Sequence, residues 1–306
     1  MQKIDLHLHS NNSDGSLTVS EVVKNLVRKK IVFAVLADHD GIDGNKEFAR
    51  LASQAGIKTI DGVEMSVYEL GAGVHILGYG IDVSNKRVLK FFKAQKDKRK
   101  KVFEKYIALF KKAGFKIDKK MYNEFAKAKS VTKAHVFKLI WELPGNRDIC
   151  FQKGLKENKA VPPPFNFQSP FIDMFMTFPG QLAYAQKKQV SAEEAIKLIH
   201  GIGGVAVWAH PGLEIEFRKN PKVFPKVFKN LLSYGLDGLE AYSTATSHTK
   251  KWIAHLRNLV QKHKLLITLG TDDHDGSRIG KLKVPEKYQD EIIKNLISKL
   301  AKTKHR

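Results

Sequence analysis

The chain has 306 residues, of which 42% are hydrophobic and 27% are charged, the composition of a folded globular protein. This length allows one large barrel or two domains. No run approaches the roughly 18 apolar residues of a membrane span, and charged residues at Lys3 and Asp5 lead us to expect no signal peptide. The single cysteine, Cys150, excludes an internal disulfide framework and suits a reducing compartment, so we expect a cytoplasmic protein.

The net charge of +22 is concentrated in one segment. Between Lys86 and Lys133 there are 18 Lys and Arg residues against 4 Asp and Glu residues, which contribute +14 of the total. A positive field of this kind attracts polyanions such as RNA or a phosphorylated metabolite. The alternative is a lysine-rich surface that contacts only water, and the sequence leaves both open.

Strand-like apolar runs recur along the chain, and polar residues follow most of them. The runs lie at 3–9, 32–37, 57–67, 73–81, 203–209, 236–242 and 265–271. Helical patterns separate several of them, beginning near Thr18 and Ser191 or covering 247–264 and 285–302. Alternating strands and helices predict an α/β fold, and about seven strands with polar carboxyl ends predict a barrel.

The segment from 85 to 190 interrupts this alternation. Apolar stripes around 102–113 and over 132–143 predict helices, and a proline-rich stretch at 161–171 (VPPPFNFQSPF) predicts a loop. We therefore predict a helical, basic, substrate-covering insertion within the barrel. The expected divisions are residues 1–84 for the first part of the barrel, 85–190 for the insertion and 191–306 for the second part of the barrel.

Histidine, aspartate and glutamate, the residue types that commonly bind metals, lie near the ends of the predicted strands. His7 and His9 are two residues apart, so both project from one face of the first strand. The others are Asp14 in a glycine turn, His39, Glu64, His75, His210, Asp272 and His274. Each alone is more often an ordinary polar residue, but so many independent polar strand ends are improbable. Imidazole and carboxylate without thiolate favour Mn, Fe or Zn over Mg, and the number of ligands predicts more than one ion.

Seven segments together resemble the motif series of the PHP (polymerase and histidinol phosphatase) family. They read DLHLHSNNSDG, LADHDGIDG, GVEMSV, VHILGYG, TKAHVFKLI, GGVAVWAHPG and GTDDHDG, in this order between residues 5 and 276. Within the family, the chain most resembles the branch of 3′,5′-nucleoside bisphosphate phosphatases and 5′-to-3′ exoribonucleases. The resemblance implies a distorted seven-stranded β/α barrel with a centre of three metal ions.

Ligands carried over from the family fall into three sets. The resemblance places one ion on His7, His9, Glu64 and Asp272, a second on Glu64, His75 and His135, and a third on Asp14, His39 and His274. His135 depends on aligning TKAH with the family's threonine-arginine-x-histidine; by pattern alone it is a structural helix histidine. Asp14 stands where other branches usually have histidine.

Contacts to the substrate phosphate are expected from Lys133, His210 and Arg278. Lys133 replaces an arginine of the family, and lysine offers a point charge rather than a bidentate fork. For His210 and Arg278 the alternatives are a strand-end cap and an ordinary surface residue.

The resemblance implies a metal-dependent phosphoesterase that uses two or three divalent ions, with Mn expected first and Fe or Zn as alternatives. The expected substrates are the 3′-phosphate of 3′,5′-nucleoside bisphosphates, or short 5′-phosphorylated RNA degraded from its 5′ end. Two other functions stay open: a small-molecule phosphatase of the histidinol-phosphate type, and a nucleic-acid-binding protein with a non-catalytic metal site.

Overall fold

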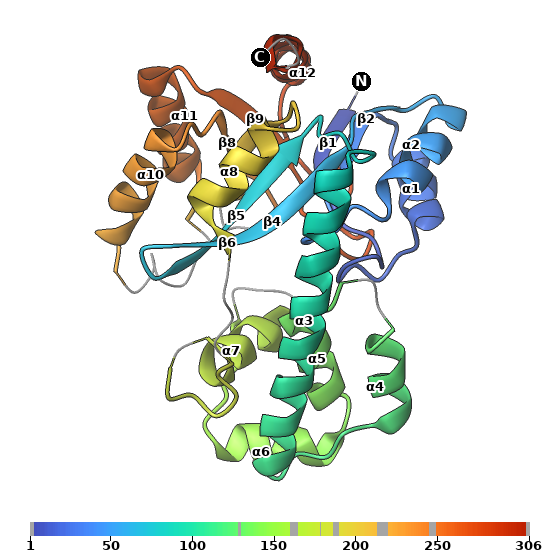
Figure 1. The fold of residues 1–306 in the computed structure, drawn as a ribbon, viewed down its shortest axis with the longest axis vertical. Helices are drawn as coiled ribbons and strands as arrows, with labels where there is room; N and C mark the ends of the chain where they lie inside the picture. The colour runs from blue at the N-terminus through green and yellow to red at the C-terminus, as the bar shows by residue number, and fades with distance from the viewer. Residues whose placement is uncertain are drawn as a thin grey trace. The chain divides into compact units, whose positions relative to one another are not determined.

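The computed structural model describes residues 3–127, 130–159, 165–177, 179–185, 190–212, 220–244 and 249–303. Its contacts divide the chain into two compact units. The first unit comprises residues 1–92 and 189–306, and the second comprises residues 93–188. The strands of the described residues all belong to the first unit, while the second unit is helical (Figure 1).

The strands of the first unit form two sheets. The smaller sheet is parallel, in the order β1-β2-β3, and the larger has the order β6-β4-β5-β7-β8-β9. In the larger sheet β5 runs antiparallel to both of its neighbours, and the other pairs are parallel. The strands are β1 (Lys3–Leu8), β2 (Ile31–Leu36), β3 (Lys58–Thr59), β4 (Gly62–Glu69), β5 (Ala72–Tyr79), β6 (Val190–Ser191), β7 (Val205–Trp208), β8 (Gly238–Ser243) and β9 (Leu266–Gly270).

Backbone hydrogen bonds join the two sheets at two places, beside the predicted ligands. The His9 amide donates to the Asp273 carbonyl and the Asp272 amide donates to the His7 carbonyl, both at 2.9 Å, which ties β1 to β9. The Asp40 amide donates to the Glu64 carbonyl at 2.8 Å, which ties the end of β2 to β4. The predicted α/β class is confirmed; among the described residues, these bridges do not show a closed barrel.

Within the described residues, six helices that lie wholly in the first unit surround these sheets (Figure 1). Thr18 and Glu21 form the predicted capping box of the first helix, and the Ser191 hydroxyl accepts from the Glu194 amide at the start of another. The second and fourth of these helices, which begin without a side-chain cap, were not predicted. The helices are α1 (Val19–Arg28), α2 (Asn45–Gln54), α8 (Ala192–His200), α10 (Val223–Ser233), α11 (Lys250–His263) and α12 (Glu286–Thr303).

The second unit has an apolar core of its own, in which the ring of Phe110 stacks on that of Phe171, 5.5 Å away. Its long first helix begins in the first unit and continues through Lys112. The helices are α3 (Lys86–Lys112), α4 (Lys119–Phe125), α5 (Lys133–Trp141), α6 (Pro144–Gln152) and α7 (Phe165–Phe175).

The proline-rich loop prediction for 161–171 is partly wrong. Residues 165–171 belong to α7, with Pro170 inside the helix. Proline cannot donate to the carbonyl four residues earlier, but the Asn158 amide donates to that carbonyl, on Asn166, at 2.8 Å. A tertiary hydrogen bond therefore replaces the missing helical one. Residues 161–164 lie outside the described part of the chain. None of the helices within the described ranges is long and apolar enough to cross a membrane.

Candidate metal centre

The Glu64 carboxylate on β4 lies at the centre of a group of imidazoles and is fully buried. Its Oε2 atom lies 3.0–3.3 Å from ring nitrogens of the three histidines His7, His9 and His39. Its Oε1 atom lies 2.9 Å from His75 Nδ1 and 3.0 Å from His210 Nε2. One carboxylate is therefore shared by five imidazoles that come from four strands or the loops after them.

A first set of ligand atoms gathers where β1 meets β9. His7, His9, Glu64 and Asp272 each offer an atom within 4.8 Å of the others. The Nε2 atoms of His7 and His9 are 3.2 Å apart, and Asp272 Oδ1 lies 3.0 Å from His9 Nε2. The two-residue spacing of the histidines places both rings on one face of β1, as the sequence predicts.

A second set lies at the β4–β5 end of the cluster. His39, Glu64 and His75 each offer an atom within 4.8 Å of the others. His210, which follows β7, also belongs here, because its Nε2 lies 3.4 Å from His75 Nδ1 and contacts Glu64 as well. The Ala209 amide donates to the His75 carbonyl at 3.0 Å, so the pairing of β5 with β7 carries His210 to this place.

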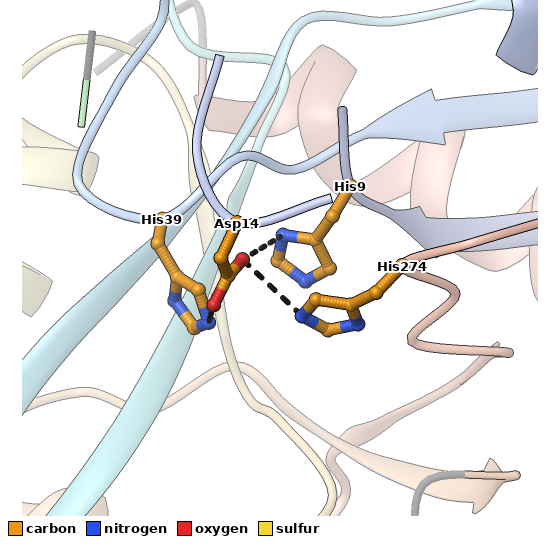
Figure 2. Close-up of side chains that lie close together, drawn as sticks. All are labelled: His9, Asp14, His39 and His274. Atoms are coloured by element: carbon orange, nitrogen blue, oxygen red, sulfur yellow. Dashed lines mark ion pairs between the residues drawn. The ribbon is translucent and has the colours of Figure 1, made fainter. Parts of the chain in front are cut away.

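A third set comprises His9, Asp14, His39 and His274. Figure 2 shows the Asp14 carboxylate between the His39 ring on one side and the His9 and His274 rings on the other. Asp14 Oδ1 lies 3.3 Å from His274 Nε2, and Asp14 Oδ2 lies 3.8 Å from His39 Nε2. The structure therefore brings together all predicted ligands of the first unit.

The residues predicted from the helical insertion lie in the second unit. There the Nδ1 atom of His135 accepts from the Thr132 amide at 3.1 Å, which caps the start of α5, and its ring contacts Phe125. Lys133 is the first residue of the same helix. Arg278 belongs to the first unit, in the loop after β9, where its Nη1 donates to the Asp272 carbonyl at 3.4 Å.

Buried carboxylates hold the loops and strands that carry these ligands, and one of them, Glu240, was not singled out from the sequence. Asp38 accepts from the Ser10 amide and hydroxyl and from the Ser13 hydroxyl at 2.6–2.8 Å, which fixes the turn before Asp14. Glu240, on β8, contacts His7 Nδ1 at 3.1 Å. A glutamate inside the apolar run 236–242 is the signal that could have pointed to it.

Three residues at the centre adopt the left-handed backbone region, which non-glycine residues rarely occupy. They are Asp40, His210 and Asp272, with φ of 44°, 30° and 50°. Each such conformation costs on the order of 1–3 kcal/mol and is typical of functional sites. The surrounding hydrogen bonds hold this strain in place.

The charges of the cluster depend strongly on one another. Burial alone would lower the pKa of His9, but the contacts with the Asp272 and Glu64 carboxylates raise it to about 10. Burial opposes ionisation of Asp14, yet the charge and the hydrogen bond of His274 hold its pKa well below the usual range. Desolvation lowers the pKa of His39 to about 3, so this ring stays neutral. The buried carboxylates therefore require compensating positive charge from their neighbours.

Divalent metal ions fit the atoms that this cluster presents. Bonds of 2.0–2.2 Å at tetrahedral or octahedral angles place neighbouring ligand atoms about 2.9–3.5 Å apart, as most of the contacts around Glu64 are. His9 Nδ1 and Glu64 Oε2 are buried and make no hydrogen bond within the described residues. Lone pairs that converge in this way, without enough protons between them, suit a cation.

The α/β fold and this cluster define a metal-dependent hydrolase. Residues 5–86 match the PHP domain family. The chain is 27% identical over 280 residues to a 5′-3′ exoribonuclease of Haemophilus influenzae, covering 89% of this chain and 90% of the relative. It is 28% identical over 278 residues to a 3′,5′-nucleoside bisphosphate phosphatase of Chromobacterium violaceum, covering 90% and 88%.

A solved structure extends the similarity to the fold. An amidohydrolase from Chromobacterium violaceum, with bound sulfate and no metal, superposes with a TM-score of 0.75 at 25% identity and covers 95% of this chain and 96% of its own. Residues 5–86 carry a PHP domain, and the chain is a metal-dependent phosphoesterase.

Proposed function

We propose that this phosphoesterase acts on nucleotides, removing the 3′-phosphate of 3′,5′-nucleoside bisphosphates or degrading short 5′-phosphorylated RNA from its 5′ end. One observation carries the proposal: a single carboxylate, Glu64, contacts ligand atoms of two adjoining sets. Ions a few ångströms apart suit a phosphate group, which offers several oxygens to them. The activities of the two relatives, which are similar over about nine tenths of the chain, support this substrate class.

The ligand sets divide the cluster among two or three ions. His7, His9, Glu64 and Asp272 would hold one ion, and Asp14, His39 and His274 another. For the remaining ion we propose Glu64, His75 and His210, since the His210 ring contacts both of the other residues. His135 stays a prediction from the family resemblance. The imidazole and carboxylate donors favour Mn, with Fe or Zn as alternatives.

When bound, such ions lower the pKa of coordinated water and neutralise charge on phosphoryl oxygens. The chain's own residues bind and orient the substrate. Arg278 places a permanent positive charge on the loop that carries Asp272 and His274, where it can pair with a phosphate. Lys133 would add a second positive charge from the start of α5. We also infer that the two sheets, bridged from β1 to β9 and from β2 to β4, form the distorted barrel of the family.

The test begins with protein that has been stripped by a chelator and reloaded with Mn²⁺. Phosphate or nucleotide release is measured on a 3′,5′-nucleoside bisphosphate, a short 5′-phosphorylated RNA and histidinol phosphate. We expect metal-dependent hydrolysis of at least one of the two nucleotide substrates and little of histidinol phosphate. Hydrolysis of histidinol phosphate alone would support the small-molecule phosphatase, and RNA binding without hydrolysis would support the nucleic-acid-binding alternative.

A further inference from the structure

Glu240 is a fully buried carboxylate that lies outside the three ligand sets. It projects from β8, the neighbour of β7 and β9 in the larger sheet. Its two oxygens make different contacts: Oε1 lies 3.1 Å from His7 Nδ1, and Oε2 accepts from the His210 amide at 2.9 Å. One side chain therefore reaches two histidines that belong to different ligand sets.

The contact with His7 involves the ring nitrogen that faces away from the ligand set. His7 Nε2 lies 3.3 Å from Glu64 Oε2 and 3.5 Å from Asp272 Oδ1, while Nδ1 faces Glu240. A carboxylate can only accept at this position, so it favours the tautomer with the proton on Nδ1. The lone pair of Nε2 is then directed at the ligand set.

The contact with His210 acts through the backbone. His210 has a φ of 30°, a conformation that needs support from its surroundings. The hydrogen bond from its amide to Glu240 supplies such support and keeps the ring against Glu64. Without it, His210 could relax toward an ordinary φ and carry its imidazole away.

The strand next to β8 is shaped to admit this carboxylate. A Cβ atom at Gly270 would lie 2.6 Å from Glu240 Oε1 and 2.2 Å from His7 Cβ. Both contacts are far closer than side chains allow. The glycine at the end of β9 thus leaves the space in which His7 and Glu240 meet.

We propose that Glu240 is a positioning residue that prepares two metal sites at once, by fixing the His7 tautomer and by holding the His210 backbone. The inference rests on the proposed metal sites and adds a residue that binds no ion itself. Partners of metal-bound histidines are typically worth about 10- to 100-fold in metal affinity. The sites of His7 and His210 should depend on Glu240, and the site of Asp14, His39 and His274 should not.

The test is a calorimetric titration of metal-free protein with Mn²⁺, comparing wild type with Glu240→Gln. An amide has one accepting oxygen, so glutamine must lose one of the two hydrogen bonds. We expect at least one site to weaken by about 10- to 100-fold, with activity restored at higher Mn²⁺ by mass action. The Asp14 site should keep its affinity.

Asp237→Asn is the matched control, because Asp237 immediately precedes the same strand and makes the same two kinds of contact. It meets the ring nitrogen of His200 at 2.7 Å and accepts from the Ala206 amide at 2.9 Å. Replacing the Asp237 carboxylate with an amide should lower the stability of the fold and leave all Mn²⁺ affinities unchanged.

The outcomes separate the inference from the function on which it rests. Wild-type protein that binds no Mn²⁺ contradicts the proposed metal sites. Wild-type affinities in Glu240→Gln, or an equal weakening of every site, overturn the role of Glu240. If the variant does not fold, ring-nitrogen chemical shifts of zinc-loaded wild type decide: His7 must carry its proton on Nδ1, and a proton on Nε2 refutes the proposal.

Discussion

At the scale of single residues, local spacing predicts which side chains share a face but not which of them meet across strands. His7 and His9 on one strand face followed from a two-residue interval, and Asp272 and His274 repeat that interval after β9. His210 was predicted to contact phosphate, and its contact with Glu64 could not be read from spacing, because it depends on the pairing of β5 with β7.

Glu64→Gln should abolish most of the activity with little effect on folding. The carboxylate contacts ligands of two sets, and glutamine removes the negative charge that both require. We expect kcat to fall by more than about 100-fold, since even an indirect partner of a ligand is worth about 10- to 100-fold. Turnover, metal content and thermal unfolding are measured together. Glu69→Gln, a buried carboxylate on the same strand that pairs with Asn230, should behave as wild type.

Asp14→Ala should remove one ion and leave the others. Asp14 contacts His274 and His39 but belongs to neither of the other sets. Metal analysis should show about one ion fewer, and kcat should fall by orders of magnitude if that ion stabilises the transition state. Higher Mn²⁺ should partly rescue Asp14→Asn. Full metal content together with unchanged kcat in Asp14→Ala would make Asp14 only a turn residue.

At the scale of elements, two helices were predicted from their side-chain caps, and two helices that begin without such a cap were missed. The Thr18 and Ser191 caps open α1 and α8 where the sequence places them. No capping side chain opens α2 or α10, which are fixed by packing, as where Phe224 stacks on the buried Trp208 at 5.1 Å. Tertiary contacts also stabilise α7 around Pro170.

Asp237→Asn should loosen the attachment of two helices to β8. The carboxylate accepts from Lys299 of α12 at 2.8 Å and pairs with His200 of α8. Charge-assisted hydrogen bonds contribute about 1.5–3 kcal/mol each where they are shielded from water; because both partners are partly exposed, we expect about 2 kcal/mol in all. Urea unfolding of metal-free wild type and variant measures this loss in the free energy of unfolding.

The difference in the free energy of unfolding between wild type and Asp237→Asn should depend on pH with a definite sign. Burial would raise the pKa of Asp237, but hydrogen bonds from His200, Lys299 and Ala206 lower it below its usual 3.8. Because the pKa is lowered in the folded state, the ionised carboxylate stabilises the fold at every pH above the pKa of the unfolded chain. This stabilisation is lost as the pH falls through the pKa of the folded state. The difference in the free energy of unfolding between wild type and Asp237→Asn should therefore become smaller below about pH 4. A difference that persists at pH 3 would contradict the ion pairs.

At the scale of the whole molecule, the order of strands gathers ligands that are far apart in the chain. Glu64, His75 and His210 meet because β4, β5 and β7 are neighbours, an order that composition and periodicity do not encode. Charge, by contrast, was visible from the sequence: the positive excess of 86–133 falls largely on α3 and the short helices of the second unit. We predict that this charge captures the anionic substrate.

The segment KDKRKK at 96–101 gives the sharpest test of that prediction. Lys98, Lys100 and Lys101 are exposed on α3, whereas Arg99 is buried and donates to the Val131 carbonyl at 3.1 Å, so Arg99 is left unchanged. Reversing the charge of Lys96, Lys98, Lys100 and Lys101 should raise KM for 5′-phosphorylated oligonucleotides by about tenfold or more at low salt, because each lost phosphate contact removes counterion release.

The effect should lie in KM rather than in kcat, because uniform binding energy is lost while the metal centre is unchanged. Added salt should make the KM values of variant and wild type converge, because salt screens the attraction between the lysines and the oligonucleotide. The matched control reverses four exposed lysines of the first unit, Lys250, Lys251, Lys262 and Lys294, for the same change in net charge. Equal increases in KM in both variants would show that only the overall net charge matters. No increase in either variant would show that the lysines of 96–101 lie on a helix face that contacts only water.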